Sequence, residues 1–356
     1  MAGPKGYSSY HGKGSKWKIV VAVLLVLVII GALVVIRMQK YVVYDDSGRP
    51  RLDLPQFSEK QPDSSQSAPA DGSGDTNLII EEPEQTAFQA VALPVGPLTD
   101  WRSAWTAASA GGTYHAAVYT VKDTDGFVYV DNQAAPAAAV KTVEGAGAAV
   151  GDMLKDDSVY TVAKIACFRD PIASSGDLEG MGLKNTGGYI FYDGNNDRWL
   201  DPAKPAARQY LIDLASACAA AGFDEILLTD VSYPSVGKLN KIDYGAVATG
   251  LPNSLQEEIT SFLTQIKTAL AQYGVKLSIQ LPFNLITAGE TAVSDSGQSL
   301  AGIVPQVDRV YADAEGDPSA LDLLKAKMAA VSKDTEFIPV LTGLDGISSE
   351  SYLIAT

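Results

Sequence analysis

The sequence predicts an α/β protein whose main domain is a TIM-type (β/α)8 barrel. Short apolar runs alternate with helical patterns from residue 88 to residue 341, which is typical of parallel sheets covered by helices. At residues 221–234 (AGFDEILLTDVSYP), Gly222 marks the end of a helix and an apolar run follows it. A run without polar alternation fits a parallel strand that is buried on both faces. Asp230 therefore lies at the carboxyl end of a central strand, where the active sites of such folds collect.

The pattern predicts the following elements. The expected strands cover residues 88–94, 115–121, 160–168, 225–231, 275–281, 307–312 and 336–341. The expected helices cover residues 100–110, 134–154, 204–220, 254–273 and 320–331, and a hairpin joins 188–192 to 198–200. Only residues 342–356 remain after the last of these strands, too few for a full helix and an eighth strand. We therefore expect the barrel to be incomplete or irregularly closed at the C-terminus.

The N-terminal part of the chain predicts a membrane anchor followed by a stalk. Residues 19–36 are uncharged and apolar, and at about 1.5 Å per residue they just span the roughly 30 Å hydrocarbon core of a bilayer. Four lysines precede this segment, which favours a cytoplasmic N-terminus and an extracellular C-terminal domain. We expect a cytoplasmic tail at 1–18, a transmembrane signal anchor at 19–36, a flexible linker at 37–87 and the barrel at 88–356. The expected location is the cell membrane, with a single pass.

Charge and composition exclude several classes of function. The formal net charge is -15, and the acidic main domain argues against a nucleic-acid partner, because phosphate binding needs a basic surface. With two histidines and no CxxC motif we expect no metal site, and we expect no cofactor. Cys167 and Cys218 are more typical of buried free thiols, although the sequence also permits a disulfide between them.

Four motifs occur in a fixed order along the predicted barrel. They are VKDTDG at 121–126, AKIACFRDP at 163–171, RWLDP at 198–202 and GFDEILLTDVSYP at 222–234. Together they resemble a family of glycoside hydrolase barrels found in many bacterial envelope proteins, whose pattern reads like DVKD-x-x-G, ARI-x-x-F-K-DP, W-x-DP and GFDEIQFDYVRFP. The resemblance covers most of residues 88–345. It implies the barrel fold and hydrolysis of O-glycosyl bonds.

The sequence departs from the family pattern at two acidic positions. Thr120 stands where the family has the Asp before Val-Lys-Asp, and Thr229 stands where it has the Asp of Phe-Asp-Tyr-Val. Asp230 is present but shifted by one residue, and side chains on a strand alternate between its two faces. If Thr229 points into the barrel mouth, we expect Asp230 to point away from it unless a local bulge intervenes. These departures predict weakened activity.

Glycoside hydrolysis generally requires two carboxyl groups that flank the bond to be cleaved. The sequence offers Asp230 and Asp123 as candidate catalytic residues. Candidate substrate-binding residues near the strand ends are Lys122, Asp170, Trp199, Asp201, Tyr233 and Asn284. Structural alternatives remain open for them, since Lys122 and Asp123 can form an ion pair that steadies a turn. Asp170 and Asp230 can begin or cap a loop, and the hairpin and strand-end residues can simply pack.

Two classes of function follow from these expectations. The first is a membrane-anchored extracellular hydrolase that acts on a cell-envelope or extracellular polysaccharide or a peptidoglycan-like glycan, with weakened activity. The alternative is a pseudoenzyme, a non-catalytic barrel that binds a glycan or another partner through the same mouth. The direction of the Asp230 side chain distinguishes the two classes, because an enzyme needs this carboxylate in the mouth near a second one.

Overall fold

The computed structural model describes residues 42–44, 50–52, 87–313, 318–344 and 349–355. The chain divides into two compact units, Met1–Ile80 and Glu81–Thr356. In the first unit, β1 (Val42–Tyr44) and β2 (Pro50–Leu52) pair antiparallel within the range expected to be a linker. The predicted transmembrane segment at 19–36 lies outside the described residues. Among the residues that are described, no helix combines the length and apolar character needed to cross a bilayer.

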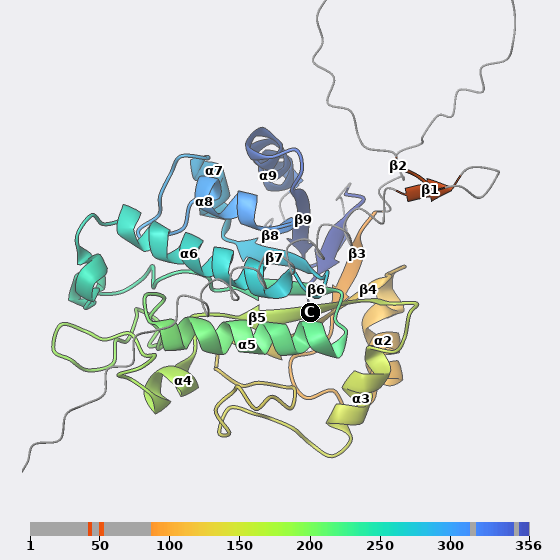
Figure 1. Ribbon diagram of the computed structural model, residues 1–356, viewed down its shortest axis with the longest axis horizontal. Coiled ribbons are helices and arrows are strands. Elements are labelled where there is room, and N and C mark those ends of the chain that lie inside the picture. Colours follow the sequence, from red (N-terminus) through yellow and green to blue (C-terminus); the bar gives the residue numbers. More distant parts are fainter. Residues whose placement is uncertain (1–41, 45–49, 53–86, 314–317, 345–348, 356) are drawn as a thin grey trace, which may run out of the picture. The chain divides into compact units, whose positions relative to one another are not determined.

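The second unit is a closed barrel of parallel strands (Figure 1). Its strands are β3 (Gln89–Ala92), β4 (Ala116–Lys122), β5 (Tyr160–Ala166), β6 (Glu225–Thr229), β7 (Lys276–Leu281), β8 (Arg309–Asp313), β9 (Glu336–Leu341) and β10 (Tyr352–Ile354). β10 pairs in parallel with both β3 and β9 and so closes the sheet. The expectation of an incomplete or irregularly closed barrel is therefore wrong. A closing strand of only three residues is sufficient.

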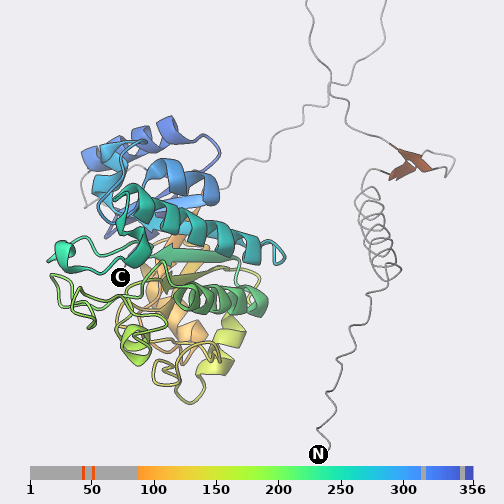
Figure 2. The same ribbon diagram turned by 60° about the vertical axis from the view of Figure 1, so that its left-hand side comes forward.

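Helices cover the outside of this barrel (Figures 1 and 2). They are α2 (Trp101–Ala108), α3 (Ala146–Met153), α4 (Pro171–Gly176), α5 (Pro205–Ala221), α6 (Asn253–Leu270), α7 (Phe283–Ala288), α8 (Leu300–Ile303) and α9 (Pro318–Val331). Single 3-10 turns cover Ser109–Gly111, Leu239–Lys241, Gly245–Ala248 and Val304–Gln306. As expected, α5 ends at Gly222, whose φ of 111° lets its N–H reach the carbonyls of the last turn.

The helix expected at 134–154 is wrong in its first half, because only α3 is helical there. The preceding segment instead pairs with the strand extension after β4, where the N–H of Val128 donates to the carbonyl of Ala139 at 2.7 Å. Pro136 lacks a donor and the residue before it disfavours helical angles, so the segment turns. Gly145, with a φ of 85°, separates this segment from α3.

Alternate residues along most of the strands fill the barrel interior. Phe88, Ala90, Ala116 and Val118 belong to one buried cluster that also includes residues of β5, β6, β8, β9 and β10. The intervening residues, such as Tyr119, belong to a larger cluster that includes the helices. This period of two identifies the inward face of these strands.

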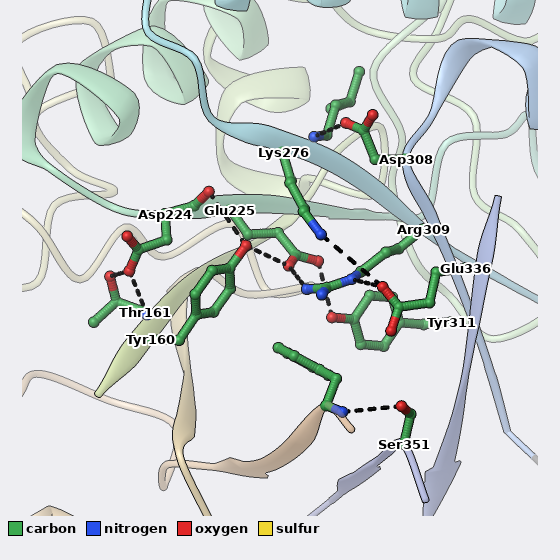
Figure 3. Close-up of polar contacts among 12 residues, drawn as sticks. Tyr160, Thr161, Asp224, Glu225, Lys276, Asp308, Arg309, Tyr311, Glu336 and Ser351 are labelled. Carbon is green, nitrogen blue, oxygen red and sulfur yellow. Dashed lines mark hydrogen bonds and ion pairs between the residues drawn. The ribbon is translucent and has the colours of Figure 1, made fainter. Parts of the chain in front are cut away.

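The amino-terminal end of the barrel is closed by a charged network (Figure 3). Arg309 donates to Glu225 at 2.5 Å and to Glu336 at 2.6 Å. Glu225 is fully buried, and it also accepts hydrogen bonds from the hydroxyls of Tyr311 at 2.8 Å and Tyr160 at 3.1 Å. A buried charge satisfied in this way joins β5, β6, β8 and β9. In TIM barrels this end serves stability, and functional sites lie at the other end.

Candidate active site

Two neighbouring cavities lie at the carboxyl ends of the strands. The mouth cavity has a volume of about 390 Å³, and its lining includes Thr120, Lys122, Asp123, Lys164, Thr229 and Asp313. The side cavity has a volume of about 530 Å³, and its lining includes Arg169, Asp193, Trp199, Asn284, Ser296 and Gln298. Asp230, Gln280 and Pro282 line both cavities, so the two adjoin at these residues.

Asp230 reaches this junction because β6 ends one residue before it. Its backbone has a φ of 52°, a left-handed conformation that few residues other than glycine adopt. The strand alternation therefore stops at Thr229, and both side chains line the mouth cavity. The Thr229 hydroxyl donates a hydrogen bond to the Asp230 carboxylate at 2.8 Å. Strict alternation would have turned Asp230 away from the mouth, and this left-handed residue has the effect that we expected only of a bulge.

Asp123 lines the mouth cavity while it holds the turn after β4. Its Oδ1 accepts hydrogen bonds from the N–H groups of Asp125 at 3.0 Å and Phe127 at 2.9 Å. Its Oδ2 accepts a hydrogen bond from the Tyr129 hydroxyl at 2.5 Å. Burial, together with the bond to Asp123, raises the pKa of Tyr129, so this hydroxyl remains a donor. Both carboxylate oxygens are thus occupied within the protein, and the catalytic role of Asp123 stays a prediction.

Lys122 and Asp170 form an ion pair in which both side chains are fully buried. The Lys122 ammonium lies 3.1 Å from Oδ2 of Asp170 and donates to the carbonyl of Ala166 at 2.7 Å. Asp170 also caps α4 by accepting a hydrogen bond from the N–H of Ala173 at 2.8 Å. Gly126, with a φ of 84°, passes so close that any Cβ there would collide with the Asp170 carboxylate. The geometry favours a structural role for both charged residues, but the ion-pair partner of Lys122 is Asp170 and not Asp123, as the structural alternative had it. Their role in substrate binding stays a prediction.

Trp199 and Asn284 line the side cavity. Trp199 is only 6% exposed, and its indole N–H donates to Oδ2 of Asp193 at 3.0 Å. Asp193 in turn accepts backbone hydrogen bonds from Asn195 and Asp197 in the hairpin turn. The indole is therefore fixed in place with its polar group satisfied, and Asn284 offers an exposed amide in the first turn of α7.

Asp170, Asp201 and Tyr233 line neither cavity. Tyr233 is fully buried and packs edge-on against Tyr244, with ring centroids 5.7 Å apart. Asp201 accepts a hydrogen bond from the N–H of Ala203 at 2.9 Å, and burial raises the pKa of its carboxyl group. All three residues hold loops together, and substrate binding by them is untested.

Lys164 is a mouth residue that the sequence reasoning missed. It lies within β5, in register with Thr120 of β4, and two residues after the inward-facing Val162. Burial lowers the pKa of its ammonium group, although the charge of Asp230 opposes this shift. The available signal was a charged residue at an inward position of an otherwise apolar strand.

Comparison with known proteins identifies a family that the chain matches. A family model described as "Putative glycosyl hydrolase domain" (DUF4015) matches residues 109–312. A search of the curated proteins found no match. Among solved structures, a hypothetical protein from Ruminiclostridium thermocellum is 26% identical, with 53% of this chain and 96% of that chain covered and a TM-score of 0.44.

Two similar structures are glycoside hydrolase domains. That of PgaB (BpsB) from Bordetella bronchiseptica is 18% identical, with 67% of this chain and 83% of that chain covered and a TM-score of 0.49. That of PelA from Pseudomonas aeruginosa is 15% identical, with 72% and 83% covered and a TM-score of 0.39. These scores are low, so the assignment rests on the family model, which spans more than half of the chain and all four motifs. The predicted resemblance is confirmed, and the chain belongs to this glycosyl hydrolase domain family.

Proposed function

We propose that this chain binds a polysaccharide across the mouth and side cavities and cleaves it weakly beside Asp230. The observation that carries this proposal is that Asp230 is the carboxylate that lines both cavities. A glycan that occupies both cavities must pass this residue. Each cavity has the size of a small-ligand site, so each suits a part of an extended chain of sugars.

The arrangement of the other polar groups explains why cleavage should be weak. Hydrolysis needs one group that protonates the leaving oxygen and a second carboxylate that stabilises the sugar cation or activates water. Asp230 can fill one role, because only its Oδ2 is engaged, by Thr229. Asp123 is the candidate for the other role, but its oxygens hold the turn and Tyr129. Thr120 and Thr229 supply hydroxyls at the two positions where the resembled pattern has carboxylates.

The membrane location belongs to the same proposal. Its support is the uncharged apolar segment at 19–36, which has the length of a membrane span and is preceded by lysines. An anchor of this kind would hold the barrel outside the cell, where the available polysaccharides are those of the envelope and its surroundings.

A second candidate function is glycan binding without hydrolysis. The occupied oxygens of Asp123 and the two threonines favour it, since they leave Asp230 without help from the two positions where the resembled pattern has aspartates. In this function, Trp199 and Asn284 would hold the glycan in the side cavity. The two candidates predict the same binding site and differ only in turnover.

The test measures new reducing ends after the full-length chain, purified in mild detergent, is incubated with a panel of envelope and storage polysaccharides. We expect slow release from at least one of them and loss of that release in Asp230→Asn. Thr229→Asp restores a carboxylate and should raise the rate, within the roughly 10²–10⁴-fold that one general acid or base contributes. Asp152→Asn, on a side chain that is 72% exposed on α3, is the matched control and should change nothing.

Two outcomes would change the assignment. Turnover that survives Asp230→Asn would show that another group carries the reaction. Glycan binding without turnover in every variant, weakened by Trp199→Ala, would select the binding function instead.

A further inference from the structure

The mouth cavity holds a cation that the proposed reaction does not use. Lys164 lines this cavity. Among the described residues, none accepts a hydrogen bond from its ammonium group or forms an ion pair with it. The Lys164 nitrogen is not fully enclosed by protein, so a molecule in the cavity can contact it. A mostly buried ammonium without a protein partner is unusual, because burial of an unpaired charge is unfavourable.

The surroundings of Lys164 explain why it lacks a counterion. The other ammonium in the mouth, that of Lys122, is neutralised by Asp170 at 3.1 Å. Thr120 lies beside Lys164 in register on β4, and Thr229 lies on β6, the neighbouring strand on the other side. These are the two positions where the resembled pattern has aspartates. At both positions this chain has a hydroxyl group instead of a negative charge.

The acidic groups of the mouth are engaged elsewhere. Asp123 accepts three hydrogen bonds within its own turn, and Asp230 accepts one from Thr229. Asp313, also in the lining, lies at the exposed end of β8. None of the three comes within ion-pair distance of Lys164, although the charge of Asp230 still acts on it. An anion held by Lys164 would lie beside Thr120, the residue in register with it on β4.

We propose that Lys164 makes the mouth cavity a subsite for a sugar that carries an anionic group, a carboxylate or a sulfate. This inference rests on the proposed function, since the anion is part of the glycan bound in the same cleft. The Lys164 ammonium, the Thr120 hydroxyl and the Gln280 amide supply donors for the oxygens of such a group. Charge-assisted hydrogen bonds of this kind are about twice as strong as neutral ones.

The test is calorimetric titration of the full-length chain with three matched oligosaccharides: a galacturonic acid tetramer, a sulfated galactose tetramer and a neutral galactose tetramer. We expect at least one acidic tetramer to bind about tenfold to a hundredfold more tightly than the neutral one, as one hydrogen bond to a charged group allows. The acidic tetramer that binds identifies the group. Lys164→Met should remove the preference, and Thr229→Asp should remove it too by giving Lys164 a carboxylate partner.

Lys155→Met is the matched control, because it deletes the same charge from a side chain that is 80% exposed on the outer surface. It should leave the preference intact, and thermal melting should show that each variant is folded. Equal binding of all three tetramers, or a preference that survives Lys164→Met, overturns the inference. If neutral glycan is bound or cleaved and acidic glycan is not preferred, the proposed function stands and only the anion subsite is refuted. If no glycan binds in this or the preceding experiment, both the proposed function and the anion subsite are refuted.

Discussion

Replacement of Lys122 with Met should destabilise the barrel rather than weaken glycan binding. The variant leaves the Asp170 carboxylate fully buried without its cation 3.1 Å away, and it deletes the bond to Ala166. Loss of one partner from a buried ion pair typically costs about 3–5 kcal/mol. Because a whole domain is stable by only about 5–15 kcal/mol, this loss is a large share of the total.

Two variants calibrate this expectation. Lys155→Met breaks the pair with Asp152, which is 4.0 Å long between side chains that are 80% and 72% exposed, so it should cost about 0–1 kcal/mol. In the double variant Lys122→Met with Asp170→Asn, the buried charge is gone and the asparagine oxygen can still cap α4. This double variant should recover much of the lost stability.

The assay is urea unfolding of the full-length chain, followed by tryptophan fluorescence, with glycan binding measured well below the transition. A loss below about 1 kcal/mol for Lys122→Met would refute the reasoning. So would unchanged stability with binding abolished, which would make Lys122 a ligand-binding residue.

Three further predictions follow from burial and from the N-terminal sequence. Burial raises the pKa of Asp201, so its protonated form favours the folded state. This contribution to stability is fully present below the ordinary carboxyl pKa and is lost as pH rises through the raised pKa. Asp201→Asn should therefore raise the melting temperature at pH 7, with a gain that shrinks toward about pH 4, and a pH-independent change would contradict this. Burial raises the pKa of Cys218 to about 12 and also raises that of Cys167, so iodoacetamide should label neither thiol until urea unfolds the chain. Rapid labelling of the folded protein would be inconsistent with this burial. Protease added outside intact cells should release a fragment that begins between residues 45 and 87, and recovery of the barrel only from the cytosolic side would rule out the anchor orientation.

The sequence predicts a strand best where its local residue pattern agrees with its burial in the fold. The strand β6 is mostly apolar and lies between Gly222 and Pro234, and it falls inside the predicted range. β10 carries no such pattern, because three residues are too few to show a period. It is a strand because β3 and β9 leave a gap for it, and this pairing joins residues far apart in the chain.

The site shows the same limit. The motifs identify Asp230 as a residue at a strand end, but its direction depends on a single left-handed backbone angle. A contact from the segment after β5 accompanies that angle, since the N–H of Phe168 donates to the carbonyl of Asp230 at 3.1 Å. Likewise, Glu225 and Arg309 are 84 residues apart, so sequence spacing could not reveal their pairing at the barrel's amino-terminal end.

Weak hydrolysis and a preference for acidic glycans have a common origin in Thr120 and Thr229. Two carboxylates at these positions would assist Asp230 and would also neutralise Lys164, so their replacement by hydroxyls changes catalysis and charge together. Thr229→Asp should consequently move both properties in opposite directions, with cleavage of a neutral polysaccharide rising and the affinity for the acidic tetramer falling. If only affinity falls, Lys164 responds to the new charge but Asp230 is not catalytic. If only cleavage rises, Asp230 is catalytic and the anion subsite lies elsewhere or does not exist.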